Sequence, residues 1–411
     1  MIVRYKCIVC GSKNLYKALD LGVMPSANDL VGKNELKKVK SYPLIYYWCK
    51  NCGLLQQRTL IEKEKLFGDH YTYMTGVNKE TVNLYTKEAK MLNKKIKNKN
   101  FAIVIASNDG TEIRLIKKFA HFKKVIGIEP AKNVAKFAID HGIPTINDFF
   151  SYSLSKKILK NMGKTDLIVA NNVFAHIPDP GDMLEGMKNL IKPDGLIEIE
   201  VHWFKSLAEK LQIDILYAEH YYEWTLKAMR FISRKHGLIV VGAESLPEQQ
   251  GGSIRFWLSK NGTETKLTLE EVQNAEAKAE VYSLNKIKKL QGQAHARKIK
   301  FIKLISKLNG QNKKIAIWSV PAKIVTLINF CDLSHKEISF AYEVAPTKVG
   351  RFIPKANIMI KSEAEIAKDM PDYLIIGAWN YLDFAKKKLG WYLKAGGKLI
   401  NPLTSEVISE N

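Results

Sequence analysis

The chain of 411 residues contains no apolar run approaching the ~18 residues that a membrane-spanning helix requires. Its first ten residues, MIVRYKCIVC, also lack an apolar run of signal-peptide length. These absences argue against a membrane protein and predict a cytoplasmic one with no membrane partner. With 46% hydrophobic residues, the chain is long enough for two or three domains, each with its own core.

Cysteine is scarce, with five residues in all, yet four of them form two C-x-x-C pairs that are each followed by glycine. In a reducing compartment such pairs favour metal binding over disulfides. Four thiolates fill the tetrahedral coordination of zinc and leave no position for water. We therefore expect a structural zinc site, with unrelated thiols as the alternative. The expected ligands are Cys7, Cys10, Cys49 and Cys52.

Acidic residues are in deficit, with 41 against 64 basic residues and a net charge of +23. The lysines are scattered through segments with helical character, such as residues 92–100 and 280–307. A nucleic-acid-binding protein would favour a clustered basic stripe with interleaved aromatics, and none is evident. Nucleic acid is therefore not an expected partner, whereas anionic sugar nucleotides would be attracted.

Residues 101–130 lack a G-x-G-x-x-G fingerprint, although they have the pattern of a strand, a turn, a helix and a second strand. Phe101 to Ile105 is an apolar run, and Asn108-Asp109-Gly110 supplies the turn. Val125 to Ile128 is a second apolar run that ends on Glu129. An acid about 20 residues after such a loop typically hydrogen-bonds a ribose. The stretch is therefore expected to bind a ribose-containing cofactor.

The same loop disfavours a dinucleotide, because it has no bare glycines to let a pyrophosphate approach a helix N-terminus. S-adenosylmethionine (SAM) has a ribose for Glu129, an amino group that suits Asn108 and Asp109 as acceptors, and no phosphate. SAM is therefore the expected cofactor. The alternative is an α/β unit in which Asn-Asp-Gly is only a tight turn.

The alternation of helices and strands continues to about residue 201 and predicts a doubly wound sheet. A short strand at 144–146 precedes Asn147, and a buried strand at 166–170 runs into Asn171, Asn172 and His176. A helix from about residue 183, a turn at 193–195 and a strand at 196–201 follow. Polar amides at the carboxyl end of a strand suit a site, whereas His176 could equally cap a helix or lie in the core.

The segment from Asp214 to Trp224 holds the densest set of titratable and aromatic residues in the chain. His220 can take a proton near neutral pH, and a neighbouring carboxylate such as Glu219 can orient it and raise its basicity. His220 is thus a general-base candidate. A loop rich in interface residues with an incidental histidine is the alternative.

Three weaker signals lie outside this segment. Tyr71 and Tyr73 share one side if their segment is extended, but aromatics so placed are more often core residues. Arg255 ends a loop with two glycines and could bind phosphate or carboxylate. Lys323 follows Pro321 at a strand-to-helix turn, where it would suit a phosphate unless the turn is a plain helix cap.

Residues 267–308 have helical spacing and are expected to connect two domains. Strands expected at 314–317, 338–342 and 373–377 then predict a second, smaller α/β unit. The expected fold class is therefore α/β, with a small zinc-binding domain, a central doubly wound Rossmann-like domain and a smaller C-terminal α/β domain.

Taken together, the short motifs of the chain resemble those of the zinc-containing, SAM-dependent sugar C-methyltransferases, which methylate a ring carbon of nucleotide-linked 4-keto sugars. The resemblance spans the whole chain. Its motifs are the two C-x-x-C pairs, Tyr71 and Tyr73, SNDG at Ser107–Gly110, GIEPA at Gly127–Ala131, NN-x-x-AHI at Asn171–Ile177, Y-x-EH at Tyr217–His220, GGSIR at Gly251–Arg255, PAK at Pro321–Lys323, K-x-GR at Lys348–Arg351 and WNY at Trp379–Tyr381.

The resemblance implies a zinc-binding domain at 1–70, a methyltransferase domain at 71–266, and a connector with a C-terminal Rossmann-like domain at 267–411. His220 would remove the proton beside the ketone, aided by Glu219, Tyr217 and His176. The implied SAM-binding residues are Ala106, Ser107, Asn108, Asp109, Gly110, Glu129, Pro130, Asn147 and Asn171. The implied residues for the nucleotide-linked sugar are Tyr71, Tyr73, Asn172, Arg255, Lys323 and Arg351.

Two departures from the family pattern stand out. Val104 and Ala106 occupy positions where the family has Glu and Gly, and Ile317–Val320 replaces a glycine-rich turn in the last domain. The alternatives are an O- or N-methyltransferase acting on RNA or a small molecule, and a SAM-independent relative that binds or isomerises a keto sugar. The sequence leaves the oligomeric state open, a monomer included.

Overall fold

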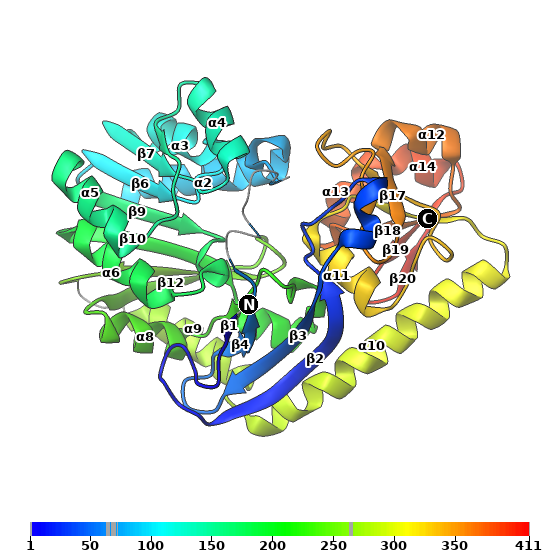
Figure 1. Ribbon diagram of the computed structural model, residues 1–411, viewed down its shortest axis with the longest axis horizontal. Helices are drawn as coiled ribbons and strands as arrows, with labels where there is room; N and C mark the ends of the chain where they lie inside the picture. The colour runs from blue at the N-terminus through cyan, green and yellow to red at the C-terminus, as the bar shows by residue number, and fades with distance from the viewer. Residues whose placement is uncertain (1, 63–65, 67–70, 72, 263–265, 411) are drawn as a thin grey trace. The chain divides into compact units, whose positions relative to one another are not determined.

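The computed structural model describes residues 2–62, 66, 71, 73–262 and 266–410, which form two compact units. Unit 1 contains Met1–Tyr16, Tyr47–Ser206 and Tyr221–Leu284, and unit 2 contains Lys17–Tyr46, Leu207–His220 and Asn285–Asn411. Each unit has its own seven-stranded sheet (Figure 1). In the described part of the chain, no helix is both long enough and apolar enough to span a membrane.

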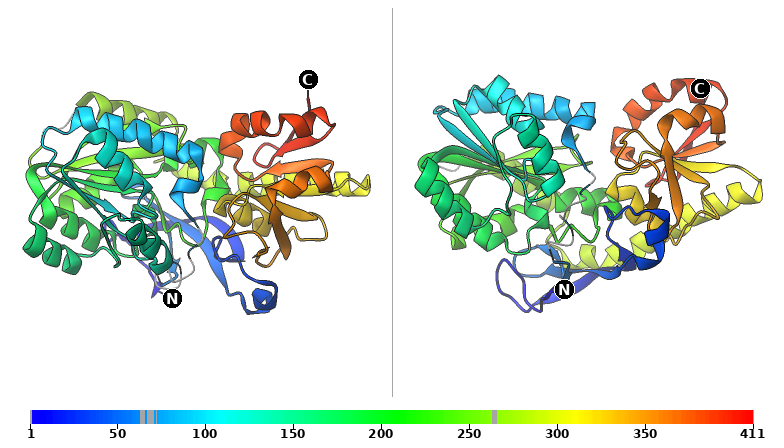
Figure 2. Two further views of the ribbon diagram at one scale, coloured as in Figure 1. Left: turned by 90° about the horizontal axis from the view of Figure 1, so that it is seen from above. Right: turned by 45° about the horizontal axis from the view of Figure 1, so that its top comes forward.

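The sheet of unit 1 has the strand order β12-β13-β10-β9-β6-β7-β8. Strands β6 to β10 are parallel, while β13 is antiparallel to both β10 and β12. The strands, cyan to green, can be followed in both views of Figure 2. Their bounds are β6 Phe101–Ile105, β7 Lys124–Ile128, β8 Thr145–Ile146, β9 Thr165–Asn171, β10 Ile191–His202, β12 Ile239–Leu246 and β13 Ser253–Ser259.

Helices cover both faces of this sheet because its central strands are apolar on both sides. On β6, Ala102 and Val104 pack with α2, α3 and α4, whereas Ile103 and Ile105 pack with α5, α6, α8 and α9. The expected doubly wound sheet is therefore confirmed. The helix bounds are α2 Lys79–Lys95, α3 Thr111–Leu115, α4 Lys132–Asp140, α5 Tyr152–Met162, α6 Pro180–Leu190, α7 Phe204–Lys210, α8 Leu226–Lys235 and α9 Lys266–Lys278.

Two details of the expected elements were wrong. Helix α6 begins at Pro180 rather than near residue 183, because the Asp179 side chain caps it and proline is well suited to the first turn. The expected turn at 193–195 is a register shift within β10, which pairs with β9 at Ile191 and again from Leu196. The bulge keeps the two apolar segments of β10 in one strand.

The N-terminal region forms a four-stranded sheet of order β11-β4-β3-β2 and a two-stranded pairing of β1 with β5. Strands β2 and β3 each contain residues of both units. The bounds are β1 Ile2–Val3, β2 Leu15–Pro25, η1 Lys33–Lys38, β3 Ser41–Cys49, β4 Leu55–Gln57, β5 Thr59–Leu60, η2 Thr75–Val77 and β11 Tyr222–Glu223.

Unit 2 contains the expected second α/β sheet, of order β16-β17-β15-β14-β18-β19-β20. Its strands are β14 Ile315–Trp318, β15 Phe340–Glu343, β16 Phe352–Ile353, β17 Ile358–Ser362, β18 Tyr373–Ile376, β19 Lys398–Asn401 and β20 Glu406–Ile408. Its helices are η5 Ile213–Ile215, α10 Leu284–Gly310, α11 Ala322–Phe330, η6 Glu363–Glu365, α12 Ile366–Asp369, η7 Trp379–Tyr381, α13 Leu382–Lys388 and α14 Gly390–Lys394.

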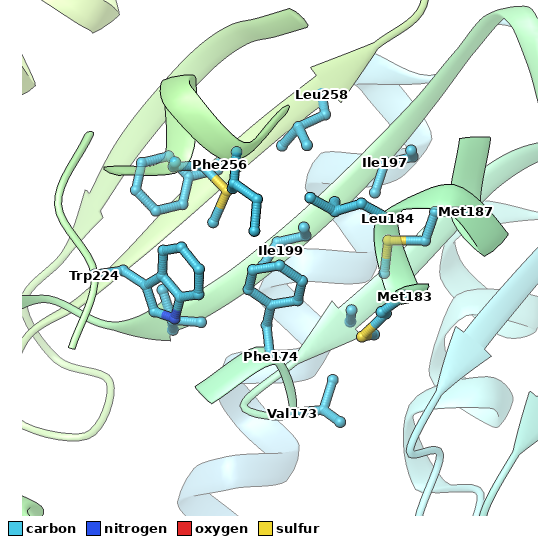
Figure 3. Packing of buried hydrophobic residues seen from close by; sticks show 14 of the residues in the cluster. Val173, Phe174, Met183, Leu184, Met187, Ile197, Ile199, Trp224, Phe256 and Leu258 are labelled. Atoms are coloured by element: carbon cyan, nitrogen blue, oxygen red, sulfur yellow. The ribbon is translucent and has the colours of Figure 1, made fainter. Parts of the chain in front are cut away.

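The larger core of unit 1 packs α6 and α8 against the sheet. Phe174 and Trp224 lie with ring centroids 4.9 Å apart in this core, and Leu184 of α6 packs in the same cluster (Figure 3). Leu184 is completely buried. This packing supports the carboxyl ends of β9 and β10.

We expect Leu184→Ala to lower the free energy of unfolding by about 2–5 kcal/mol, because it removes buried methyl groups and leaves a cavity. Denaturant titration followed by tryptophan fluorescence measures the change. Met162→Ala, at an exposed position that ends α5, is the matched control and should change stability by less than about 0.5 kcal/mol. A loss below about 1 kcal/mol for Leu184→Ala would contradict this assignment of the core.

Candidate active site and metal centre

The four cysteines of the two C-x-x-C pairs converge in unit 1, with all four Sγ atoms within 4.8 Å of one another. Cys7 Sγ lies 3.5 Å from Cys52 Sγ, and Cys10 Sγ lies 3.5 Å from Cys49 Sγ. Disulfide sulfurs would be ~2 Å apart. Thiolates placed tetrahedrally at ~2.3 Å from zinc lie about 3.8 Å from one another. The donor set and its spacing fit a structural zinc ion.

Each pair is folded into the same knuckle by backbone hydrogen bonds. Gly11 N–H donates to the Cys7 carbonyl and Gly53 N–H to the Cys49 carbonyl, both at 2.9 Å. Both glycines have positive φ, 69° and 77° respectively, a conformation that costs a residue with a Cβ free energy. The glycine after each C-x-x-C is thus needed to turn both cysteines toward one point.

The second site lies at the carboxyl edge of the unit 1 sheet. Strand β6 pairs with β7 on one side and with β9 on the other, so the direction of winding reverses between β6 and β9. In open α/β sheets, ligands bind outside the carboxyl ends of the strands at this point. The loops that follow β6 and β9 begin with Ala106 and Asn172, which are the residues expected to bind SAM and sugar.

The loop after β6 has an unusual backbone for a segment with one glycine. Ala106, Asn108 and Gly110 have φ of 55°, 51° and 76°. A Cβ in the left-handed conformation costs roughly 1–2 kcal/mol, so the backbone at Ala106 is one that favours glycine.

Glu129 directly follows β7 and contacts this loop. It is 4% exposed, and its carboxylate accepts the N–H of Asn108 at 2.9 Å and that of Ala131 at 2.8 Å. Burial raises the pKa of Glu129 to about 7, although the two backbone hydrogen bonds act in the opposite direction. A buried carboxylate in this place can accept hydrogen bonds from ribose hydroxyls.

Two buried polar atoms at the same edge await a partner. In the described part of the chain, Ser107 Oγ and Asn171 Oδ1 have no hydrogen-bond partner. Buried polar groups are normally satisfied, so orphaned atoms beside an acid point to a polar ligand. Gly127 lies against Ser107, because a Cβ at Gly127 would be 2.2 Å from Ser107 Oγ. These residues fit SAM, which Ser107, Glu129 and Asn171 would hold.

The other expected SAM residues shape the loops. Asn108 Oδ1 accepts the N–H of Thr75 at 2.8 Å, and Asp109 Oδ2 accepts that of Gly76 at 2.7 Å. Asn147 donates from Nδ2 to the carbonyls of Glu129 at 2.8 Å and Pro130 at 3.1 Å. Asn108 and Asp109 therefore tie the segment after Tyr73 to the loop, a task that the sequence did not reveal.

Arg255 lies on β13, 4% exposed, among buried carboxylates rather than at an open phosphate site. It contacts Glu198, and its Nη2 lies 3.3 Å from Glu88 Oε2 and 3.4 Å from Glu200 Oε2. Burial raises the pKa of Glu198 well above its usual range and that of Glu200 to about 7. With its charge directed to these acids, Arg255 is better suited to hold the network than to bind substrate.

This network reaches the two amides at the carboxyl end of β9. Asn171 Nδ2 donates to Glu88 Oε1 at 2.7 Å and to Glu112 Oε1 at 2.8 Å. Asn172 Nδ2 donates to Glu200 Oε1 at 3.2 Å. The side chains of Asn171 and Asn172 are therefore oriented by buried carboxylates.

The remaining expected site residues divide between the units. Tyr71, Tyr73 and His176 belong to unit 1, and His176 ends the short helix η4 Phe174–His176 after β9. In unit 2, Lys323 is 5% exposed with Nζ 5.1 Å from the ring centroid of Trp379. Arg351 donates from Nη1 to the Leu30 carbonyl at 2.8 Å.

The expected catalytic group forms a tight turn in unit 2. His220 N–H donates to the Tyr217 carbonyl at 2.9 Å, which closes the turn. His220 Nε2 lies 2.5 Å from the Tyr217 hydroxyl, and the two rings have centroids 3.9 Å apart. Glu219, between them in sequence, is 1% exposed. Tyr217 and His220 thus form a hydrogen-bonded pair.

Unit 1 also contains a buried histidine–carboxylate pair that the sequence pattern did not predict. His202 ends β10, and its Nδ1 lies 2.6 Å from Glu223 Oε2; both side chains are buried. The available signal was a histidine directly after a buried strand, the same placement that singled out Asn171. The partner Glu223 could be found only from the fold.

Three family models match the chain in order. They are a zinc binding domain over residues 7–67, a methyltransferase domain over 105–243 and a C-methyltransferase C-terminal domain over 248–404. With the switch-point site and the four-cysteine centre, these matches define a SAM-dependent methyltransferase with a structural zinc ion. The chain is also 27% identical to the C-methyltransferase NovU of Streptomyces niveus over 403 residues, 97% of this chain and 95% of that protein. The three matches in order and this relative together support a zinc-containing C-methyltransferase.

Two further likenesses are more limited. A ubiquinone biosynthesis O-methyltransferase of Colwellia psychrerythraea is 36% identical over 73 residues, 18% of this chain and 28% of that protein. A solved SAM-dependent methyltransferase from Archaeoglobus fulgidus aligns with a TM-score of 0.36 and 15% identity over 49% of this chain and 88% of that chain. A similarity this low carries no argument about function.

Metal analysis should find about one zinc per chain, because the four thiolates complete one tetrahedral site. Cys52→Ser should lose the zinc and lower the thermal midpoint of unit 1, since metal binding contributes folding free energy. Cys331→Ala is the matched control, because Cys331 lies outside the centre, and it should keep the zinc. Folded wild-type protein without zinc would contradict the site.

Glu129 should make cofactor affinity depend on pH. Because its pKa is about 7, the carboxylate that accepts from the ribose predominates at pH 8, and the neutral acid predominates at pH 6. We expect S-adenosylhomocysteine to bind roughly five- to tenfold more weakly at pH 6 than at pH 8 by calorimetry. Glu129→Gln should bind weakly at both pH values.

The same pKa gives a stability effect of defined sign. The folded pKa of Glu129 is raised from 4.5 to about 7, so its contribution to the free energy of unfolding is lost as pH rises between these values.

Glu270→Gln, at an exposed position on α9, should leave both the binding profile and the stability profile unchanged. Affinity that is equal at pH 6 and pH 8 in the wild type would exclude Glu129 as the ribose acceptor.

Proposed function

We propose that this C-methyltransferase acts on a carbon beside the ketone of a nucleotide-linked 4-keto sugar, in the synthesis of an unusual sugar for a surface polysaccharide or a glycosylated small molecule. The observation that carries the proposal is the Tyr217–His220 pair, in which a hydroxyl holds an imidazole at 2.5 Å. A base is needed when the methyl acceptor is a carbon beside a ketone.

The chemistry explains the need for a base. A carbon next to a carbonyl becomes nucleophilic only when it loses a proton and forms an enolate. A positioned imidazole is suited to accept that proton at neutral pH. Bound SAM supplies the electrophilic methyl group. The enolate carbon would form the new C–C bond as the S–CH3 bond breaks and S-adenosylhomocysteine leaves, and His220 would retain the proton until it exchanges with solvent.

The hydroxyl of Tyr217 has a second task in this proposal. Its hydrogen bond to Nε2 selects the orientation of the His220 ring, and stacking at 3.9 Å between centroids restricts rotation. Tyr217 also offers a polar group beside the reacting proton. His176, on the loop after β9, is proposed as a donor to the developing oxyanion, a role that hydrogen-bond donors fill in many enolate-forming sites.

The nucleotide would be attracted by the positive charge of the chain. The net charge of +23 raises the local concentration of an anionic nucleotide diphosphate. By the family resemblance, the proposed contacts for the nucleotide-linked sugar are Tyr71, Tyr73, Asn172, Lys323 and Arg351.

His220→Ala should reduce methyl transfer by about 10²–10⁴-fold while leaving the affinity for SAM within a few-fold. The assay follows methyl transfer to 4-keto sugars linked to TDP, CDP or GDP and, separately, deuterium wash-in beside the ketone. His335→Ala is the matched control, because this exposed histidine lies in the same unit. Full turnover by His220→Ala would refute the base assignment, and deuterium exchange without methyl transfer in the wild type would point to an isomerising enzyme.

A further inference from the structure

We propose that the loop Ser26–Asn28 and Tyr46 position His220, and that Glu219 is the anchor they hold rather than a group that touches substrate. This inference rests on the proposed function, because it concerns the residue that would remove the proton. All these residues belong to unit 2, although residues 17–46 lie in sequence between the two cysteine pairs.

The first observation is that Glu219 is held by the loop that ends β2. Ser26 Oγ donates to Glu219 Oε1 at 2.5 Å, and Asn28 donates to the same oxygen from N at 3.0 Å and from Nδ2 at 3.2 Å. Ala27 N–H donates to Oε2 at 3.3 Å. A carboxylate has about four acceptor positions, so four donors from three consecutive residues direct Glu219 toward the loop.

The burial of Glu219 gives this contact its strength. Glu219 is 1% exposed and Ser26 is 7% exposed, so the hydrogen bonds form where water competes little. A buried carboxylate is tolerated only when donors replace its water, and charge-assisted hydrogen bonds are roughly twice as strong as neutral ones. The loop therefore fixes the backbone at position 219, directly before His220.

The second observation concerns the backbone on both sides of Glu219. The hydroxyl of Tyr46, on β3, donates to the His220 carbonyl at 2.6 Å and lies 3.2 Å from the Tyr217 carbonyl. Tyr46 is completely buried. The two ends of the 217–220 turn are thus held by one hydroxyl, and its middle is held by the 26–28 loop.

Together these contacts give the N-terminal β2–β3 hairpin a defined role. The hairpin grips the turn through the side chain of Glu219 and through two carbonyls, which leaves the imidazole of His220 paired with the Tyr217 hydroxyl. A displacement of about 1 Å at a reacting group can cost ~10²-fold in rate. Ser26, Asn28 and Tyr46 are therefore positioning residues for proton removal.

The test compares loop variants with the wild type in the full-length, zinc-loaded protein. The double variant Ser26→Ala/Asn28→Ala removes two of the four donors, and Tyr46→Phe removes the hydroxyl alone. We expect kcat for the 4-keto sugar to fall by about 10²-fold in the double variant, with KM for the sugar and the affinity for SAM within a few-fold. Deuterium wash-in should fall in parallel, since it needs the same base.

Three controls separate positioning from folding. Ser26→Thr keeps the hydroxyl and should retain most of the activity. Asn34→Ala, at an exposed position of η1, should match the wild type. Glu219→Gln should lower kcat to a similar extent as the loop double variant, and combining the two should cost little more, because both remove the same interaction.

A second measurement does not depend on the sugar. The imidazole ¹⁵N resonances of His220, assigned by their absence in His220→Ala, should shift in Ser26→Ala/Asn28→Ala but not in Asn34→Ala. Unchanged resonances, or a kcat within about threefold of wild type, would overturn the positioning role. Turnover that survives His220→Ala would instead reject the proposed function, and the resonances would still decide whether the loop orients His220.

Discussion

The expected SAM site, at the carboxyl edge of the unit 1 sheet, depends on one buried carboxylate directly after a parallel strand. Glu129 accepts the N–H of Asn108 and so joins the loop after β6 to the end of β7. Because the backbone of Asn108 is held in this way, its side-chain Oδ1 can accept the N–H of Thr75. This hydrogen bond fixes the segment after Tyr73 against the loop. Burial raises the pKa of Glu129 to about 7, so its ionised fraction changes with pH in the physiological range.

In unit 2 a carboxylate also accepts a backbone N–H of a loop that follows a strand, and that loop has no glycine-rich turn. Glu343 ends β15, and its Oε2 accepts the N–H of Val320 in the loop after β14 at 3.1 Å. That loop contains Ser319, a non-glycine residue with φ of 68°, just as the unit 1 loop contains Ala106. In unit 1 the acid after β7 holds the loop that follows β6, and in unit 2 the acid that ends β15 holds the loop that follows β14. Each of these loops contains a non-glycine residue with positive φ. Carboxylate capture of backbone N–H groups can therefore stabilise a loop shape that other Rossmann-like folds reach with glycine.

The catalytic proposal depends on a different kind of support. His220 lies in a turn and not in a helix or strand, so side-chain hydrogen bonds set its orientation. The hydroxyls of Tyr217 and Tyr46 and the donors of residues 26–28 supply these bonds. A base on a loop can be as well ordered as one on a helix when buried polar groups hold it from several sides.

The sequence by itself determined the elements that depend on local pattern. The apolar run 101–105, the turn chemistry at 108–110 and the acid at 129 predicted the β6–β7 unit, and C-x-x-C spacing with its glycines predicted the zinc ligands. These signals are local, since an apolar run, a turn and each C-x-x-C pair need only a few adjacent residues. Short motifs in order also indicated the family, which the comparisons confirm.

Only the tertiary structure decided which distant groups meet. Arg255 was expected to bind a phosphate or a carboxylate, and it lies among the carboxylates of Glu88, Glu198 and Glu200, because pairing of adjacent strands brings β10 and β13 side chains together. Glu219 was expected to aid catalysis directly, yet its oxygens face Ser26 and Asn28, about 190 residues earlier. Neither partner can be read from spacing, because a hydrogen bond between distant residues depends on how sheets and loops pack.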